Sequence, residues 1–253
     1  MTDLLYQRDA YLREFDATVV ATADGGAILD RTAFYPGGGG QQPDRGTLQS
    51  GGRAWTVTGF RREGDDLVHL FEGDAPPVGA AIHGAIDWDF RYRMMRTHTA
   101  LHLLCGVIWR DLGAQVTGGQ MYEDRARMDF SLEDFGPERL RWIEGRVNEE
   151  IAASRPVEVK FLPREEAFQI PDLIRTKVNL LPVGIETIRI VDIHGLDLQA
   201  DGGTHVANSR EVGAIRIVKS ENKGKQNKRI EIVVEEAPPS HDLGRTAAAS
   251  DSE

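Results

Sequence analysis

Residues 89–113 read "DFRYRMMRTHTALHLLCGVIWRDLG", and apolar side chains recur in this stretch every three to four residues. This period predicts one long α-helix, and Gly113 is a typical residue for its end. His98 and His102 lie four residues apart, so the same face of the helix presents both imidazoles. Two such histidines are either ligands of one metal ion or well-packed core residues, and this stretch alone leaves both interpretations open.

The single cysteine, Cys105, lies further along the same helix. A rise of about 10.5 Å separates it from His98, so the two side chains cannot both bind an ion that His102 also binds. We therefore expect Cys105 to be a buried structural thiol. One cysteine also excludes an intrachain disulfide and a Cys-rich zinc finger.

Upstream of the helix, short β-branched and aromatic segments alternate with Gly, Asp and Pro. Closely spaced strands of this kind are typical of a small barrel or a curled antiparallel sheet. The expected strands include ATVVAT (17–22), GAILDRTAFY (26–35), RAWTVTGF (53–60), LVHLFEG (67–73) and IHGAIDW (82–88).

Downstream of the helix, helical and strand patterns alternate. The pattern predicts a helix over 137–154, a helical turn within 163–170, and strands at 156–162, 185–193, 211–220 and 228–236. We therefore predict an α+β protein with three parts. They are a β-rich, barrel-like domain over residues 1–88, an α/β domain with a long central helix over 89–236, and a disordered tail over 237–253.

The chain has 253 residues, with 30 Lys and Arg against 40 Asp and Glu, and a formal net charge of −10. An acidic chain is a poor general binder of nucleic acid, because sequence-independent phosphate binding depends on clustered cations. The stretch KSENKGKQNKR (219–229) is a local exception. We predict that Lys223, Lys225 and Lys228 contact RNA phosphates there, the alternative being a solvated loop.

No apolar run approaches the ~18 residues that a membrane span requires, so we expect no membrane partner. The first residues, MTDLLYQRDAYLREF, carry several charges, which does not fit a secretory signal peptide. These features favour a cytoplasmic protein.

Residues 34–46 read FYPGGGGQQPDRG and contain four consecutive glycines, Gly37, Gly38, Gly39 and Gly40. Ordering such a run in a helix or strand has a high cost in conformational entropy. It is typical of a loop that a ligand approaches closely, or of a flexible hairpin connection. It is not a phosphate-binding Walker loop, because no Gly-Lys-Ser/Thr follows it.

Residues 197–206 read DLQADGGTHV, and Gly202 and Gly203 separate Asp201 from His205. The two glycines predict a tight turn whose backbone N–H groups can point at an anion. Combined with His98 and His102, His205 supplies the third ligand of a catalytic zinc site that keeps one position open.

In this order and at these separations, FYPGGGGQQPDRG, RTHTALHLL and DGGTHV resemble the AlaX family of free-standing alanyl-tRNA editing proteins. The same stretches are similar to the editing domain of alanyl-tRNA synthetase. Segments at 87–96, 116–130 and 223–234 fit the pattern, so the resemblance covers about residues 15–236. It implies a Zn²⁺-dependent deacylase, acting without ATP, whose partner is mischarged tRNA(Ala) carrying serine or glycine.

The resemblance also implies roles for individual residues. His98, His102 and His205 match the zinc ligands of the family, while Asp201 occupies a position where the family usually has cysteine. Asp201 is then either the fourth ligand or a group that supports a ligand or a bound water. The Gly-rich loop with Gln41 matches the stretch that discriminates the aminoacyl group.

Hydrolysis of an aminoacyl ester needs an activated water and stabilisation of a developing oxyanion, and zinc can serve by activating water or by orienting substrate. The candidate catalytic side chains are Gln41 and Thr204, and the candidate backbone donors are Gly202 and Gly203. Serine differs from alanine by one hydroxyl, which a hydrogen-bonding site discriminates far better than an apolar pocket. The candidates for reading that hydroxyl are Thr97, Thr99, Thr204 and Gln41.

Two other functions fit the residues. One is a metal-dependent hydrolase of another small ester or amide. The other is a non-catalytic RNA-binding module with a structural metal.

Overall fold

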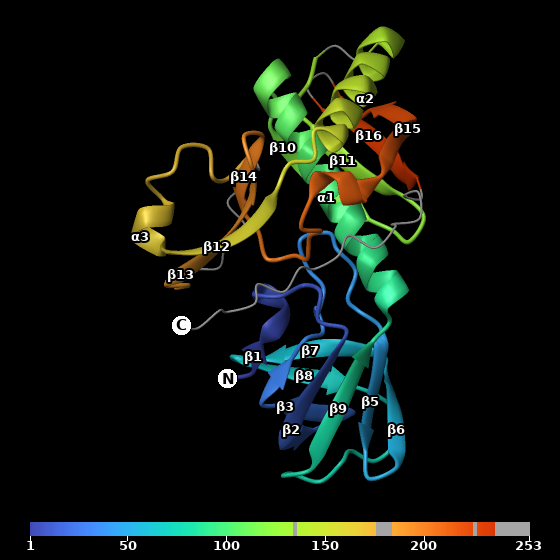
Figure 1. Ribbon diagram of the computed structural model, residues 1–253, viewed down its shortest axis with the longest axis vertical. Helices are drawn as coiled ribbons and strands as arrows, with labels where there is room; N and C mark the ends of the chain where they lie inside the picture. The colour runs from blue at the N-terminus through green and yellow to red at the C-terminus, as the bar shows by residue number, and fades with distance from the viewer. Residues whose placement is uncertain (134–135, 176–183, 225–226, 236–253) are drawn as a thin grey trace, which may run out of the picture.

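The computed structural model describes residues 1–133, 136–175, 184–224 and 227–235. Within them the strands form sheets of seven, four and three strands and one two-stranded pair. Figure 1 shows the seven-stranded sheet at one end, and helix α1 (Trp88–Leu112) rising from it toward the other sheets. The predicted α+β class is confirmed. The predicted tail, 237–253, lies outside the described residues.

The seven-stranded sheet is antiparallel throughout and has the order β6-β5-β9-β2-β3-β8-β7. Its outermost strands, β6 and β7, follow each other directly in the chain through Thr58, whose N–H donates to the carbonyl of Leu70. The sheet therefore curls back on itself, as predicted. Its strands are β2 (Glu14–Ala23), β3 (Gly26–Leu29), β5 (Gly46–Ser50), β6 (Arg53–Val57), β7 (Gly59–Glu63), β8 (Asp66–Leu70) and β9 (Ala81–Ile86).

Two segments predicted as single strands are each broken, so these two predictions were wrong. The segment 26–35 leaves the large sheet at Asp30, whose carboxylate accepts from the N–H of Thr18. It continues as β4 (Arg31–Thr32), which pairs in parallel with β1 (Asp3–Leu4). The segment 53–60 is divided between β6 and β7 at Thr58. In both segments the β-branched pattern continues while the chain changes its pairing partner.

Helix α1 begins after Asp87, whose carboxylate accepts from the N–H of Phe90. It ends at Gly113, which adopts a left-handed φ of 65°. The buried face of α1 forms the centre of the largest hydrophobic cluster, together with residues of α2 (Pro137–Ala152) and of the four-stranded sheet. No helix among the described residues is both long enough and apolar enough to cross a membrane.

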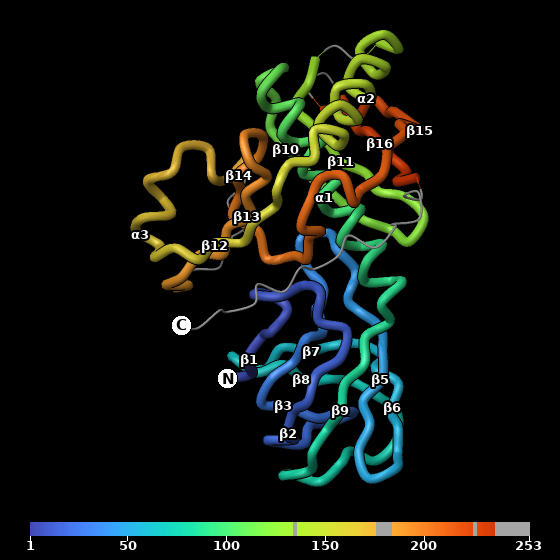
Figure 2. The backbone as a smooth tube through the Cα atoms, in the orientation of Figure 1, coloured from blue at the N-terminus to red at the C-terminus, as the bar shows by residue number. Residues whose placement is uncertain are grey.

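The four-stranded sheet has the order β10-β11-β16-β15, and the three-stranded sheet has the order β12-β13-β14. Figure 2 shows that the chain runs from α2 to the three-stranded sheet. After β14 it returns past α1 to the four-stranded sheet. The remaining elements are β10 (Val116–Met121), β11 (Ala126–Phe130), β12 (Val157–Pro163), α3 (Arg164–Ala167), β13 (Thr187–Ile193), β14 (Asp197–Ala200), β15 (Ala214–Asn222), β16 (Lys228–Glu235) and the 3-10 helices η1 (Leu5–Gln7) and η2 (Ser209–Val212).

A buried ion pair joins α1 to the end of the Gly-rich loop. The guanidinium of Arg91 binds the carboxylate of Asp44, and both side chains are fully buried. Arg91 also donates to the carbonyl of Ala33 at 2.6 Å, and Asp44 accepts from the N–H of Tyr35 at 2.6 Å. The loop is therefore anchored to the helix that carries His98 and His102.

Candidate metal centre

The structure brings together the four residues that the sequence predicts as metal ligands. His98 and His102 project from α1, while Asp201 and His205 come from the loop after β14. One ligand atom of each residue lies within 4.8 Å of the others. The ring centroid of His205 is 4.2 Å from that of His98 and 4.7 Å from that of His102. All three imidazoles are buried.

Each imidazole has its Nδ1 atom in a hydrogen bond. The partners are Gln41 Oε1 for His98 at 3.0 Å, Asp197 Oδ2 for His102 at 2.8 Å, and Thr99 Oγ1 for His205 at 3.1 Å. The partner atom of His98 is an oxygen, because it also accepts from the N–H of Thr204 at 3.1 Å. A carboxylate can likewise only accept. The neutral rings of His98 and His102 therefore carry their proton on Nδ1 and their lone pair on Nε2.

These lone pairs face the carboxylate of Asp201. The distances to Asp201 Oδ1 are 3.6 Å from His98 Nε2 and 4.0 Å from His102 Nε2, while His205 Nε2 makes a hydrogen bond of 3.1 Å with Oδ2. Ligand atoms on one tetrahedral zinc, with bonds of about 2.0–2.2 Å, lie roughly 3.4 Å apart. Lone pairs and a carboxylate that converge in this way repel one another unless a cation lies among them, so the arrangement fits a bound metal ion.

The charges of the cluster suit a cation as well. Burial lowers the pKa of His98 well below its usual value and that of His205 to about 4. Burial alone would raise the pKa of Asp201, but the surrounding imidazoles hold it well below its usual range. Burial also opposes protonation of His102, yet the hydrogen bond that its Nδ1–H donates to the Asp197 carboxylate raises its pKa. Imidazole nitrogen and carboxylate oxygen are both good zinc ligands.

The Gly-rich loop is docked rather than free. Gly38 and Gln41 exchange backbone hydrogen bonds, and the carbonyl of Gly40 accepts from the N–H of Met121 at 2.8 Å. A Cβ atom on Gly40 would lie 2.8 Å from the carbonyl oxygen of Gly119, so only glycine allows this approach to β10. The loop, Gly37 to Gly40, thereby carries the buried side chain of Gln41 to the cluster.

The two predicted catalytic side chains bind each other. Gln41 Nε2 donates to Thr204 Oγ1 at 2.8 Å, and both residues are buried beside His98. Thr99, one of the candidate readers of the serine hydroxyl, instead contacts His205 Nδ1 and accepts from the N–H of Val206.

The Gly202–Gly203 turn packs closely against the cluster. The N–H of Gly203 donates to Asp201 Oδ2 at 2.7 Å, so the expectation of a free N–H at Gly203 was wrong. A Cβ atom there would lie 2.3 Å from His98 Cε1, which requires glycine at this position. Gly202 is exposed beside it.

Two of the predicted phosphate-binding lysines, Lys223 and Lys228, lie on the β15–β16 hairpin and do not join the cluster. Lys223 is exposed, and its amine contacts Glu221 at 2.7 Å. Lys228 is buried, and its amine donates to Asn222 Oδ1 and to the carbonyl of Gly224, which does not favour its predicted contact with a phosphate. Lys225 lies outside the described residues.

Sequence reasoning missed Asp197 and Arg189. Arg189 donates to the backbone carbonyl of Asp201 at 2.8 Å and so supports the loop that carries two ligand groups. The alternation Asp197-x-Gln199-x-Asp201 could have indicated Asp197, because residues two apart in a strand share a face.

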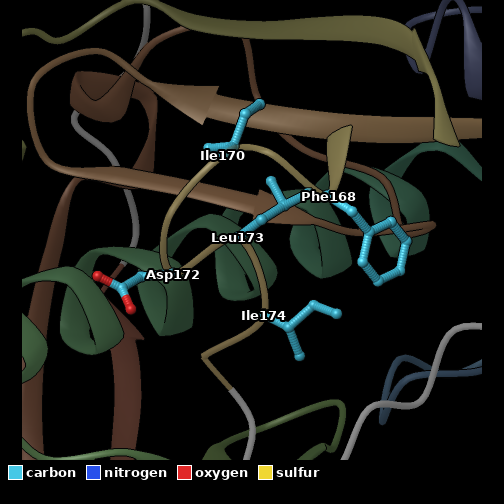
Figure 3. A pocket seen from close by; sticks show the side chains of 5 residues that line it. All are labelled: Phe168, Ile170, Asp172, Leu173 and Ile174. Carbon is cyan, nitrogen blue, oxygen red and sulfur yellow. The ribbon is translucent and has the colours of Figure 1, made fainter. Parts of the chain in front are cut away.

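Away from the cluster, a hollow of about 230 Å³ lies next to α3 and is lined by Phe168, Ile170, Asp172, Leu173 and Ile174. Figure 3 shows these side chains. None of them is a predicted site residue. Its lining has one carboxylate, Asp172, and lacks the convergent ligand groups that mark the histidine cluster.

The fold and the cluster together define an α+β protein with a candidate divalent-metal centre at the middle of α1. Two family models match the chain: "tRNA synthetases class II (A)" over residues 9–90, and "Threonyl and Alanyl tRNA synthetase second additional domain" over residues 188–231.

The alanyl-tRNA editing protein AlaX-M of Saccharolobus solfataricus is 42% identical over 233 residues, which cover 91% of this chain and 98% of that protein. AlaX-M of Methanosarcina barkeri is 40% identical over 237 residues, with the same coverage of 91% and 98%. The alanine–tRNA ligase of Ignicoccus hospitalis is 36% identical over 258 residues, but this chain spans only 28% of that enzyme. The chain belongs to the AlaX-M family of alanyl-tRNA editing proteins.

Proposed function

We propose that this chain hydrolyses the ester bond of tRNA(Ala) that has been wrongly charged with serine or glycine, acting in trans on the free aminoacyl-tRNA. The observation that carries the proposal is the convergence of His98, His102, His205 and Asp201 within 4.8 Å. Relatives named as alanyl-tRNA editing proteins match this chain over 98% of their own length, which supports the substrate class.

The same four residues would hold one divalent cation per chain, with zinc as the best match to three imidazoles and a carboxylate. When bound, zinc supplies Lewis-acid chemistry that polarises an ester carbonyl or acidifies a water. The chain contributes ligands whose orientation is fixed, because each Nδ1 atom already has a partner.

Gln41 and Thr204 would contact the aminoacyl group. Their mutual hydrogen bond leaves a second amide hydrogen on Gln41 and the hydroxyl hydrogen of Thr204. Donors of this kind can bind the hydroxyl of serine or the developing oxyanion. The Gly37–Gly40 loop and the exposed Gly202 would form the rim against which the substrate backbone lies.

The experiment compares three substrates: Ser-tRNA(Ala), Ala-tRNA(Ala) and the methyl ester of serine. We expect rapid release of serine from Ser-tRNA(Ala) and slow hydrolysis of the other two. Equal hydrolysis of the free ester would favour a general esterase. RNA binding without hydrolysis of any substrate would favour a non-catalytic RNA-binding module.

Metal content is measured in the same preparations. We expect one zinc ion per chain in the wild type and loss of the metal in His98→Ala and His205→Ala, because each change removes a ligand. If both variants retain full metal content, the ligand assignment is wrong.

A further inference from the structure

The carboxylate of Asp197, at the start of β14, is fully buried behind His102. Its Oδ2 atom accepts from His102 Nδ1 at 2.8 Å and from Gln199 Nε2 at 2.8 Å. Its Oδ1 atom accepts from Arg175 Nη1 at 2.5 Å. These three partners of the carboxylate are all donors, and one of them carries a full positive charge.

Arg175 is itself held in place from a second side. Its guanidinium lies 5.6 Å from the ring centroid of Trp109 on α1, and its carbonyl accepts from the N–H of Val116 on β10. A buried carboxylate without a cationic partner is costly, so Arg175 permits Asp197 to remain charged at this depth. The pair thus places a fixed negative charge against the Nδ1 side of one ligand ring.

We propose that Asp197, held by Arg175, is the positioning residue of the ligand His102. It selects the tautomer with the proton on Nδ1, and it fixes the plane of the ring so that the Nε2 lone pair points at Asp201. His98 and His205 have the uncharged partners Gln41 and Thr99 at their Nδ1 atoms, so His102 alone among the three has a charged one. A carboxylate partner raises the basicity of a ligand imidazole. This inference rests on the proposed metal centre.

The test measures the zinc affinity of the metal-free full chain by competition with a chelator. In Asp197→Asn the new NH₂ group must face one of three donors, so at least one hydrogen bond is lost. We expect zinc affinity to fall about 10–100-fold, the range typical of lost support for a ligand histidine. The matched control, Asp192→Asn, removes a carboxylate from the adjacent strand β13, where it binds Lys160, and should leave the affinity unchanged.

The ring nitrogens of His102 give a second readout. In the metal-free wild type, at a pH high enough for the ring to be neutral, ¹⁵N chemical shifts should show the proton of His102 on Nδ1, and Asp197→Asn should show a mixture of tautomers. A purely structural role of Asp197 would not change this tautomer in a folded variant. Wild-type affinity together with an unchanged tautomer would overturn the proposal.

Failure of the proposed function gives a different result. If the wild type binds no zinc, or if His98→Ala binds it equally well, the metal centre itself is wrong. Should Asp197→Asn fail to fold, Arg175→Gln keeps the carboxylate but removes its cationic partner. We expect this variant to bind zinc several-fold more weakly, and wild-type affinity in it would equally overturn the proposal.

Discussion

In the proposed metal centre, Asp201 would decide how strongly the site prefers zinc. Its carboxylate faces three imidazoles, but a carboxylate oxygen is harder than a thiolate and selects zinc less strongly. We predict that Asp201→Cys keeps the release of serine and binds zinc more tightly. Asp201→Ala should weaken zinc retention or slow deacylation at least about tenfold. Chelator competition and single-turnover deacylation measure the two effects.

The control for this pair is Asp192→Ala, which removes the same charge from a carboxylate that binds Lys160 and does not belong to the ligand cluster. It should behave like the wild type in both assays. Normal metal content and normal serine release in Asp201→Ala would remove Asp201 from the site.

Neighbouring site residues could be predicted from the sequence where the local secondary structure fixes their spacing. Positions four apart in a helix must share a face, so His98 and His102 could be paired from the sequence. The support of those rings could not be predicted in the same way. Gln41 reaches His98 from the Gly-rich loop, and Arg175 reaches Asp197 from another loop, so neither contact has a local signature.

The β15–β16 hairpin carries Lys223 and Lys228 of the predicted RNA contact. The amine of Lys228 is occupied by hydrogen bonds within the hairpin, so we restrict the prediction of phosphate contact to Lys223 and Lys225. We expect the double change of these two lysines to alanine to weaken tRNA binding. The slope of log affinity against log salt should fall by something under about 1 for each lost phosphate contact.

Filter binding or fluorescence anisotropy at several salt concentrations measures both quantities. Lys160→Ala on β12 is the matched control, since it removes one lysine whose amine already binds Asp192. Affinity and salt slope that stay at the wild-type values in the double variant would leave the hairpin as a solvated loop.

At the level of elements, the sequence predicted which segments form strands better than where each strand ends. The segment 53–60 has a continuous β-branched pattern, yet its two halves form opposite edges of the seven-stranded sheet. Side-chain periodicity reports that a segment is extended. It does not report which neighbour the backbone pairs with, and that choice depends on residues far away in the chain.

The stability of the whole molecule should depend on pH through His69 of β8. This side chain is fully buried between Phe34 and Phe60, with its Nε2 atom 2.8 Å from Thr32 Oγ1. Burial lowers its pKa from 6.5 to about 4. Because the unfolded chain binds the proton more tightly, the stability from neutral His69 is complete above about pH 6.5 and is lost as the pH falls toward 4.

Between pH 7.5 and pH 5 we expect the wild type to lose about 2 kcal/mol more unfolding free energy than His69→Phe, which cannot titrate. Urea unfolding at the two pH values, followed by tryptophan fluorescence, measures the difference. Equal losses in the two proteins would show that protonation of His69 is not coupled to folding.

The contact from Gln41 to His98 has a consequence for how this protein can be divided. A fragment that begins at α1 contains all four ligand groups, yet it lacks the amide that orients one imidazole and the carboxylate that binds Arg91. The two parts are therefore not interchangeable modules. Grafting the histidines onto another protein scaffold must therefore include the Gly-rich loop. The smallest segment that can be transferred with a complete site extends across both parts of the fold.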